Sequence, residues 1–417
     1  MTSTLTSTAG SRPLLAHRHV ARLLVGTLIG RLPNGMAPIA ILLLVADQGG
    51  SLKTGGLLCA LYGLASALGQ PVLGRMVDRR GQTLPTASAV LFTTLCLLAL
   101  AMVKVAAEPT LAAVLVTLAG LSTPPLEAGL RALWPVVLPD EAQRRAALAL
   151  DTGAQGLIYV TGPLLVAVLS TATGPRAALG VTAALGLLGT AVVLSAAPSR
   201  RWRPLPAVHR AGALGPLDHA GLRWLFIAVS GVGFALGAVN VGAVSIADNL
   251  GIDLLSGLIP AALSVGSLVG GVLYGRRTWP GTTADQLLSA ALLFAVAWLP
   301  LMAATGPLPA IALTAVPGLL LTAVITSAFT AVDSLAPPGT TTEAYAWLIT
   351  AVGTGQAAGT ALSGTLAERP LLSAALPAVG AALTPAVLFA ARRHLTAPSV
   401  TTQLRGPHRH PVADGGH

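Results

Sequence analysis

Twelve long apolar segments account for most of this chain of 417 residues. An α-helix needs about 20 apolar residues to cross the hydrocarbon core of a bilayer, and each segment reaches that length. Bounded by Pro, Gly and charged residues, the predicted spans are 20–46, 56–76, 86–106, 110–138, 147–170, 175–197, 223–247, 255–275, 285–305, 307–334, 343–366 and 370–392. Hydrocarbon cannot hydrogen bond to open backbone groups, so every span must be a helix. We therefore predict an all-α membrane protein with twelve transmembrane helices.

The composition excludes most classes of water-soluble protein. Charged residues make up 10% of the chain and hydrophobic residues 53%, whereas a soluble domain carries about 25% charged residues. So few charges cannot cover a water-facing surface of this size, which argues against a soluble enzyme, a disordered chain and a repeat scaffold. The sequence also contains no P-loop, catalytic triad or metal-ligand cluster, so we predict no enzymatic activity, no bound metal and no cofactor.

The basic residues are distributed unevenly between the loops. If the N-terminus lies inside, 19 of the 25 Lys and Arg residues fall in inside loops and tails and four fall outside, while Arg31 and Arg131 lie within spans. Cytoplasmic loops of membrane proteins concentrate Lys and Arg, so both termini are predicted to be cytoplasmic. The net charge of +10 then reflects topology, and no nucleic-acid partner is expected. The use of 23 Arg and 2 Lys is typical of a GC-rich bacterial genome, which predicts a bacterial inner membrane.

The longest internal polar stretch, residues 198–222, separates the first six spans from the last six. Its Arg and Pro residues indicate a cytoplasmic linker between two bundles. We therefore predict an N-terminal six-helix bundle over residues 1–197, a C-terminal six-helix bundle over 223–395 and a disordered polar tail over 396–417.

The two halves can be superposed with a fixed offset of 201 residues, which aligns Gly30 with Gly231 and Gly69 with Gly270. Parallel six-span repeats, related by an axis along the membrane normal, are a transporter architecture in which the substrate path lies between the halves. The repeat therefore predicts a path near the bilayer midplane.

The loop after the second span contains Gly74, Arg75, Asp78, Arg79 and Gly81 in the order Gly-Arg-Met-Val-Asp-Arg-Arg-Gly. This loop resembles the signature of the major facilitator superfamily at the position between spans two and three where that family carries it. The twelve spans, the division into six and six, the basic linker and a shorter copy of the loop at residues 275–277 extend the resemblance to the whole chain. It implies two pseudo-symmetric six-helix bundles and transport by alternating access.

The signature loop departs from the family pattern at Gln82 and Thr83, where basic residues are usual, and its second copy has no Asp. In the family, the loop carboxylate lies near the N-terminus of span eleven, where the helix dipole favours negative charge. The resemblance therefore implies that Asp78 and Arg79 hold the two halves together when the cavity opens outward. The alternative is a solvated loop that only sets topology.

Four ionisable residues within the spans stand out, namely Arg31, Glu127, Arg131 and Asp151. Burying such groups in a membrane is costly unless they are paired, so they are candidates for function. Glu127 and Arg131 are four residues apart, which places them on one helix face where they can pair. In one interpretation Arg31 faces the central cavity while Glu127 or Asp151 carries a proton. In the other, Glu127, Arg131 and Asp151 form a structural network with the signature loop.

Further polar and helix-breaking residues lie in the same spans. Pro33, Asn34 and Pro38 predict a break or kink in the first span that frees carbonyl groups near the cavity. Polar side chains within a span, such as those of Gln155 and Asn240, can line the cavity or hydrogen bond to neighbouring helices. The same two possibilities apply to the polar groups of Tyr159, Trp347 and Gln356.

Gly162 and Pro163 in the fifth span resemble the Gly-Pro element of antiporters in the same superfamily, although the glycines that usually follow are missing. The resemblance favours export. We predict a monomeric secondary transporter in the lipid bilayer that exports a small organic molecule and takes its energy from the proton gradient. Two alternatives stay open: proton-coupled uptake of a nutrient, and a membrane sensor or partner protein that transports nothing.

Overall fold

The computed structural model describes residues 14, 17–203, 215–252, 254–277, 279–303, 306–366 and 370–395, and its regular elements are all helices. The first half contains α1 Val20–Asp47, α2 Leu52–Arg80, α3 Thr83–Met102, α4 Pro109–Leu121, α5 Leu126–Val137, α6 Glu141–Thr173, α7 Pro175–Leu194 and α8 Ala197–Arg201. The second half contains α9 Ala220–Leu250, α10 Leu255–Gly275, α11 Thr283–Ala297, α12 Pro307–Leu335, α13 Thr341–Thr365, α14 Pro370–Ala390 and α15 Arg392–Leu395. Two short 3-10 helices are η2 Gly215–Asp218 and η3 Leu299–Ala303.

The predicted all-α membrane fold is confirmed. Ten helical segments are long and apolar enough to cross a membrane, and Ala374–Ala390 is a shorter apolar helix. The remaining span is α13, whose Thr, Gly and Gln residues lower its hydropathy, and which packs against α9 and α2. Residues 204–214 of the predicted linker and the predicted tail, 396–417, lie outside the described residues.

Proline affects two spans in different ways. The fourth span is divided into α4 and α5 at residues 122–125, where Pro124 and Pro125 remove backbone donors and disfavour helical geometry in the residue before each of them. The first span is uninterrupted: α1 stays helical from Val20 to Asp47 through Pro33 and Pro38. Of the predicted break or kink, the break is therefore wrong, because a packed membrane helix tolerates proline, and a kink at these residues stays a prediction.

The aligned glycines of the repeat occupy matching contacts in the two halves. In the first half, a Cβ on Gly189 of α7 would collide with the backbone of Gly30 on α1. In the second half, a Cβ on Gly231 of α9 would lie 2.6 Å from the carbonyl oxygen of Gly380 on α14. The helix pairs α1–α7 and α9–α14 therefore approach closely at equivalent places.

A second aligned pair behaves in the same way. Gly69 of α2 lies against the backbone of Leu121 in α4, and Gly270 of α10 lies against that of Leu319 in α12. The offset of 201 residues thus relates equivalent helix contacts in the two halves. At each contact a glycine, which has no side chain, allows two backbones to touch.

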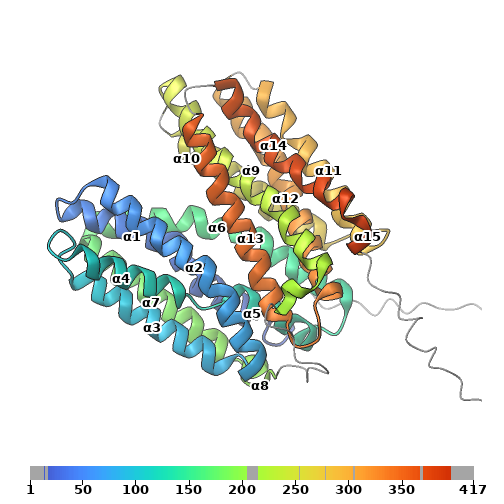
Figure 1. Cartoon of the computed structure of the whole chain (residues 1–417), viewed down its shortest axis with the longest axis horizontal. Coiled ribbons are helices and arrows are strands. Elements are labelled where there is room, and N and C mark those ends of the chain that lie inside the picture. Colours follow the sequence, from blue (N-terminus) through green and yellow to red (C-terminus); the bar gives the residue numbers. More distant parts are fainter. Residues whose placement is uncertain are drawn as a thin grey trace, which may run out of the picture.

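The two halves are packed together at one end of the molecule and diverge toward the other (Figure 1). Contacts between the halves are made chiefly by α2 with α13 and by α6 with α10, with further contacts of α5 with α13. We call the end that contains the α2–α3 connection and the start of α13 the closed end.

Candidate functional site

The four intramembrane charges meet in one buried cluster, which we call the charge network. The Arg31 guanidinium donates to Glu127 Oε2 at 2.6 Å and to Asp151 Oδ1 at 2.9 Å. The Arg131 guanidinium pairs with Glu127 Oε1 at 2.6 Å and with Asp151 Oδ2 at 3.0 Å. Each carboxylate therefore contacts both arginines, and the network joins α1, α5 and α6.

The network is compact because α1, α5 and α6 pack against one another and Arg131 follows Glu127 by one helical turn. The side chains of Arg131 and Asp151 are fully shielded, and those of Arg31 and Glu127 are 3% and 10% exposed. Removing four charges from water costs several kcal/mol per ion, and only mutual pairing can offset that cost. The two positive and two negative groups cancel in net charge.

A cavity of about 370 Å³ lies between the two halves beside the network. It is lined by residues of both halves: Glu127, Thr152, Gln155, Gly156, Tyr159, Val160, Leu236, Asn240, Pro260, Leu263, Ser264, Ser267, Leu321, Ile325, Phe329, Leu348, Ile349, Val352, Gly353 and Gln356. Among the described residues in this wall, Glu127 carries the single carboxylate, and Gln155 donates to its Oε2 at 3.3 Å.

The predicted site residues are thus divided between the cavity wall and the layer behind it. Glu127, Gln155 and Asn240 line the cavity. Arg31 was expected to face the cavity in one interpretation, but it is buried between the carboxylates of Glu127 and Asp151. Asn34 lies on the edge of a separate cavity of about 20 Å³ inside the first half, so it is not part of the central cavity wall.

The signature loop contacts the other half at the closed end. Asp78 accepts hydrogen bonds from the backbone N–H groups of Thr342 at 3.1 Å and Glu343 at 2.8 Å. These donors are the unpaired groups at the N-terminus of α13, where a carboxylate is also favoured by the helix dipole. Arg75 forms a two-point pair with the Glu343 carboxylate at 2.6 and 2.8 Å. We call Arg75, Asp78 and Glu343 the latch.

Arg79 does not take the place expected for it. Its side chain is exposed at the end of α2, and Arg75, one turn earlier, forms the ion pair across the halves. Residues four apart share a helix face, so Arg75 and Arg79 differ mainly in their distance from the end of α2. Glu343 at the start of span eleven was a sequence signal that an arginine of the loop could pair there, but it did not select between Arg75 and Arg79.

Two glycines of the loop are required for different structural reasons. Gly74 lets α13 approach, because a Cβ there would lie 3.0 Å from the carbonyl oxygen of Thr342. Gly81 ends α2 with a φ of 84°, a conformation that other residues rarely adopt. At the departure from the family pattern, the buried Gln82 accepts a hydrogen bond from Ser199 of α8 at 2.8 Å. In the described part of the chain, the hydrogen-bond and ion-pair partners of the charge network are its own members, Thr152 and Gln155, so it is not joined to the signature loop as the second interpretation expected.

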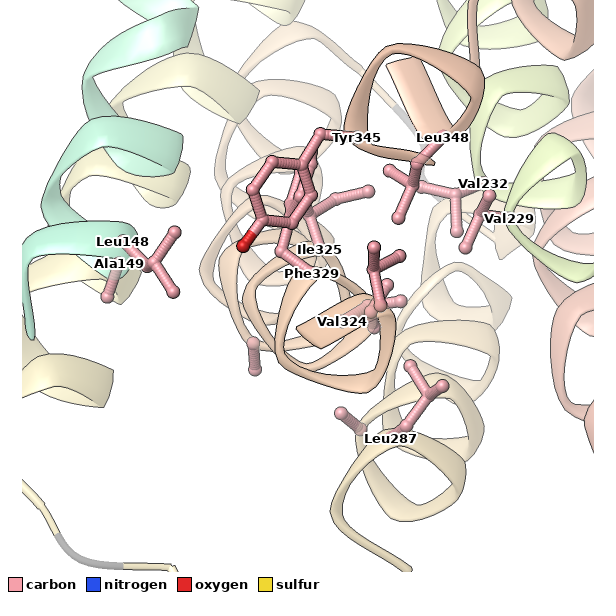
Figure 2. Close-up of a cluster of buried hydrophobic side chains, with 14 of the residues drawn as sticks. Leu148, Ala149, Val229, Val232, Leu287, Val324, Ile325, Phe329, Tyr345 and Leu348 are labelled. Atoms are coloured by element: carbon pink, nitrogen blue, oxygen red, sulfur yellow. The ribbon is translucent and has the colours of Figure 1, made fainter. Parts of the chain in front are cut away.

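Aromatic residues of the second half connect the two sites. The Arg131 guanidinium lies 3.5 Å from the centre of the Phe329 ring on α12. Phe329 in turn packs edge-on against Tyr345 of α13, at 5.4 Å between ring centres, and the two lie together in the core shown in Figure 2. The Tyr345 hydroxyl donates to Asp333. Sequence reasoning missed Phe329, because Arg131 on α5 and Phe329 on α12 belong to different halves and meet only when the halves pack together.

The remaining predicted positions lie nearby. Gly162 packs against the backbone of Gly35 on α1, and Pro163 lies within the uninterrupted helix α6. Tyr159 and Gln356 line the cavity, whereas Trp347 packs on the apolar core. In the described part of the chain, no three His, Cys, Asp or Glu side chains come close enough together to hold a metal ion.

A multi-pass helical bundle with a cavity between two repeated halves defines a class, the membrane transporters. The family model of the Major Facilitator Superfamily matches residues 23–360, which is most of the chain. The chain therefore belongs to the Major Facilitator Superfamily, and it is a membrane-embedded transporter rather than an enzyme. A search of curated proteins finds no matching sequence.

Solved structures of the same fold cover nearly the whole chain. The human organic anion transporter MFSD10 is 17% identical, with 93% of this chain and 100% of that chain covered and a TM-score of 0.67. FucP in the outward conformation is 15% identical, with 90% and 98% covered and a TM-score of 0.65. A bacterial homologue of the iron transporter ferroportin, in an outward-facing state, is 13% identical, with 90% and 100% covered and a TM-score of 0.65.

Proposed function

We propose that this chain is a secondary active transporter that moves a small organic molecule by alternating access. The observation that carries the proposal is a cavity between two repeated halves, with a carboxylate in its wall and an ionic latch at one end. Breaking the latch would let the halves separate at the closed end and come together at the other. The cavity would then exchange its access from one side of the membrane to the other.

Glu127 is our candidate for the proton-binding group. Its side chain is the one member of the charge network that reaches the cavity wall, so water and protons can approach it. Two guanidinium groups stabilise its charged form. If a movement of α1 or α5 draws one guanidinium away, the network is left with an uncompensated negative charge, which a proton on Glu127 would cancel. Proton binding and helix movement would be coupled in this way.

The orientation and direction of transport are also part of the proposal. The closed end contains the cluster of Arg75, Arg79 and Arg80, so the distribution of basic residues favours a cytoplasmic closed end, cytoplasmic termini and a cavity open to the outside. The Gly162–Pro163 element supports export from a bacterial inner membrane. The protein would act as a monomer, take its energy from the proton gradient and need no bound cofactor.

Uptake by proton symport is the second candidate. It is favoured by the structural likeness to a protein described as the E. coli fucose:proton symporter, which is 14% identical over 90% of this chain with a TM-score of 0.65. The first structural neighbour is described as an organic anion transporter, but no Lys or Arg side chain is among the described residues that line this cavity.

The proposal is tested with purified protein in liposomes that contain a pH-sensitive dye. A panel of small organic compounds is added, and compound-dependent proton movement is expected for the wild type. Glu127→Gln should abolish proton movement but retain exchange of the compound across the membrane. Glu141→Gln removes an exposed carboxylate of α6 and should behave like the wild type. Unchanged proton movement in Glu127→Gln would overturn the role of this residue, and opposite signs of proton movement distinguish antiport from symport.

A further inference from the structure

The cavity wall carries no uncompensated charge. The Glu127 carboxylate, the single charged group in the described wall, already accepts hydrogen bonds from Arg31 and Gln155 and forms an ion pair with Arg131. Both arginines lie behind it and are almost completely buried. A cationic ligand would have to displace an arginine to reach the carboxylate, and an anionic ligand would meet no exposed cation. The displaced arginine would be left buried without a partner, and the anion would lose its water without gaining an opposite charge.

Free hydrogen-bonding groups are present on the opposite wall. Asn240 of α9 and Gln356 of α13 line the cavity, and within the described residues neither amide has a hydrogen-bond partner. The hydroxyl of Ser264 in the same wall donates to the carbonyl of Pro260 at 3.1 Å, so it can offer a ligand only an acceptor. The two amides can therefore donate to and accept from a ligand, because each amide offers both an oxygen and an NH₂ group.

The rest of the wall is largely apolar, and the cavity is large enough to hold a small molecule. Leu236, Leu263, Ile325, Leu348 and Val352 contribute aliphatic surface. A volume of about 370 Å³ falls within the range of roughly 300–1,000 Å³ that is usual for small-molecule pockets, in which a few polar groups orient a mostly apolar ligand.

We propose that the cavity binds an uncharged amphiphilic molecule, whose carbonyl, amide or hydroxyl group hydrogen bonds to Asn240 and Gln356 while its apolar body packs on the aliphatic wall. This inference rests on the proposed transport function and names the substrate class. The compensated charge network excludes ionic recognition, and the two amides supply the polar contact.

Binding to the full-length protein in lipid nanodiscs tests the inference without any gradient. Three probes of matched shape are compared by titration calorimetry: diphenylacetamide, the protonated diphenylethylamine and diphenylacetate, with empty nanodiscs as the blank. The amide is expected to bind roughly tenfold more tightly than either ion. Asn240→Leu and Gln356→Leu should each weaken binding of the amide roughly tenfold, which corresponds to the loss of one hydrogen bond. Asn240→Ala and Gln356→Ala serve as smaller replacements if the leucine variants are not monodisperse.

Gln286→Leu is the matched control, because Gln286 is an exposed amide on α11 that hydrogen bonds to the carbonyl of Trp279. It should bind the amide like the wild type. The inference is overturned if either ion binds as tightly as the amide, if the amide does not bind, or if the cavity variants bind it like the wild type. A protein that binds the amide but carries no flux in liposomes would overturn the transport proposal while supporting the binding preference.

Discussion

Asp151 is the most completely buried member of the charge network, and its two carboxylate oxygens contact different arginines. Replacing the carboxylate by an amide would leave Arg31 and Arg131 with only Glu127 to balance two positive charges. The remaining surplus charge would stay buried, because neither guanidinium can reach water without moving its helix. Replacing a buried charged residue of this kind destabilises the fold because its partners keep their charges and lose their ion pairs.

We expect Asp151→Asn to lower the free energy of unfolding by about 3–5 kcal/mol, the usual cost of breaking a buried ion pair by removing one partner. The measurement is reversible unfolding of the purified protein in mixed micelles. Glu141→Gln is the control, since it breaks the exposed pair of Glu141 with Arg145 on the same helix. That change should cost less than about 1 kcal/mol. An equal loss of unfolding free energy in the two variants would contradict the inference that a buried ion pair costs more to break than an exposed one.

At the scale of elements, α6 and α10 are the pair whose contact crosses the halves beside the cavity. A Cβ on Gly153 of α6 would lie 2.8 Å from the carbonyl oxygen of Ser267 and 3.4 Å from Gly271 Cα, both on α10. A Cβ on Gly156 would lie equally close to Ser264. The absence of side chains at these positions allows the two backbones to approach, and a larger residue must push the helices apart.

We therefore expect Gly153→Val to separate α6 from α10 and to shift the protein away from the state closed at this end. Spin labels at cysteines replacing Ala142 and Arg276, which lie exposed at the closed end, would report a longer distance by pulsed EPR. Cys59 and Cys96 are replaced in this background. Gly63→Val on α2 is the matched control, because a Cβ there meets nothing within 4 Å. An unchanged distance in Gly153→Val would show that the glycine contact does not support closure.

The helix α13 connects the two functional regions. Its N-terminus receives Asp78, its first turn carries Glu343, and Tyr345 touches Phe329, which stacks on Arg131 of the charge network. Further along, Gln356 reaches the cavity. A movement of this single helix would therefore change the latch, the aromatic contact and the cavity wall together.

At the scale of the whole molecule, alternating access requires that the closed end separate during each cycle. Ala146 of α6 and Gly275 of α10 face each other there, and a Cβ on Gly275 would lie 3.3 Å from that of Ala146. This separation is only slightly shorter than the 3.5–4.5 Å that is usual across a disulfide. A cross-link between these positions would join the two halves in the closed arrangement.

We expect the double variant Ala146→Cys and Gly275→Cys, in a background without Cys59 and Cys96, to lose transport on oxidation and to regain it on reduction. The measurement is flux in liposomes with and without reductant. Each single-cysteine variant is the control and should be insensitive to oxidant. Undiminished flux in the oxidised, fully cross-linked protein would mean that transport does not require separation of the halves at this end.

The residues differ in how far sequence reasoning could place them. The pairing of Glu127 with Arg131 follows from their spacing on one helix. Arg31 is 96 residues from Glu127 in the chain, and Arg75 is 268 residues from Glu343. No local pattern selects between Arg75 and Arg79, so the partner of Glu343 could be identified only once α2 was docked on α13. For the same reason, the sequence could name candidate residues for the cavity wall, but it could not show which of them lie together around one cavity.

The sequence by itself determined the helical membrane fold, the number of spans and the repeated halves, because segment length, hydropathy and glycine spacing are local properties that a bilayer constrains strongly. It also marked the signature loop and the four intramembrane charges. Only the tertiary structure decided that those charges neutralise one another, that Arg31 lies behind the cavity wall and that α1 continues through its prolines. These outcomes depend on which helix faces meet, and that is set by packing between segments far apart in the chain.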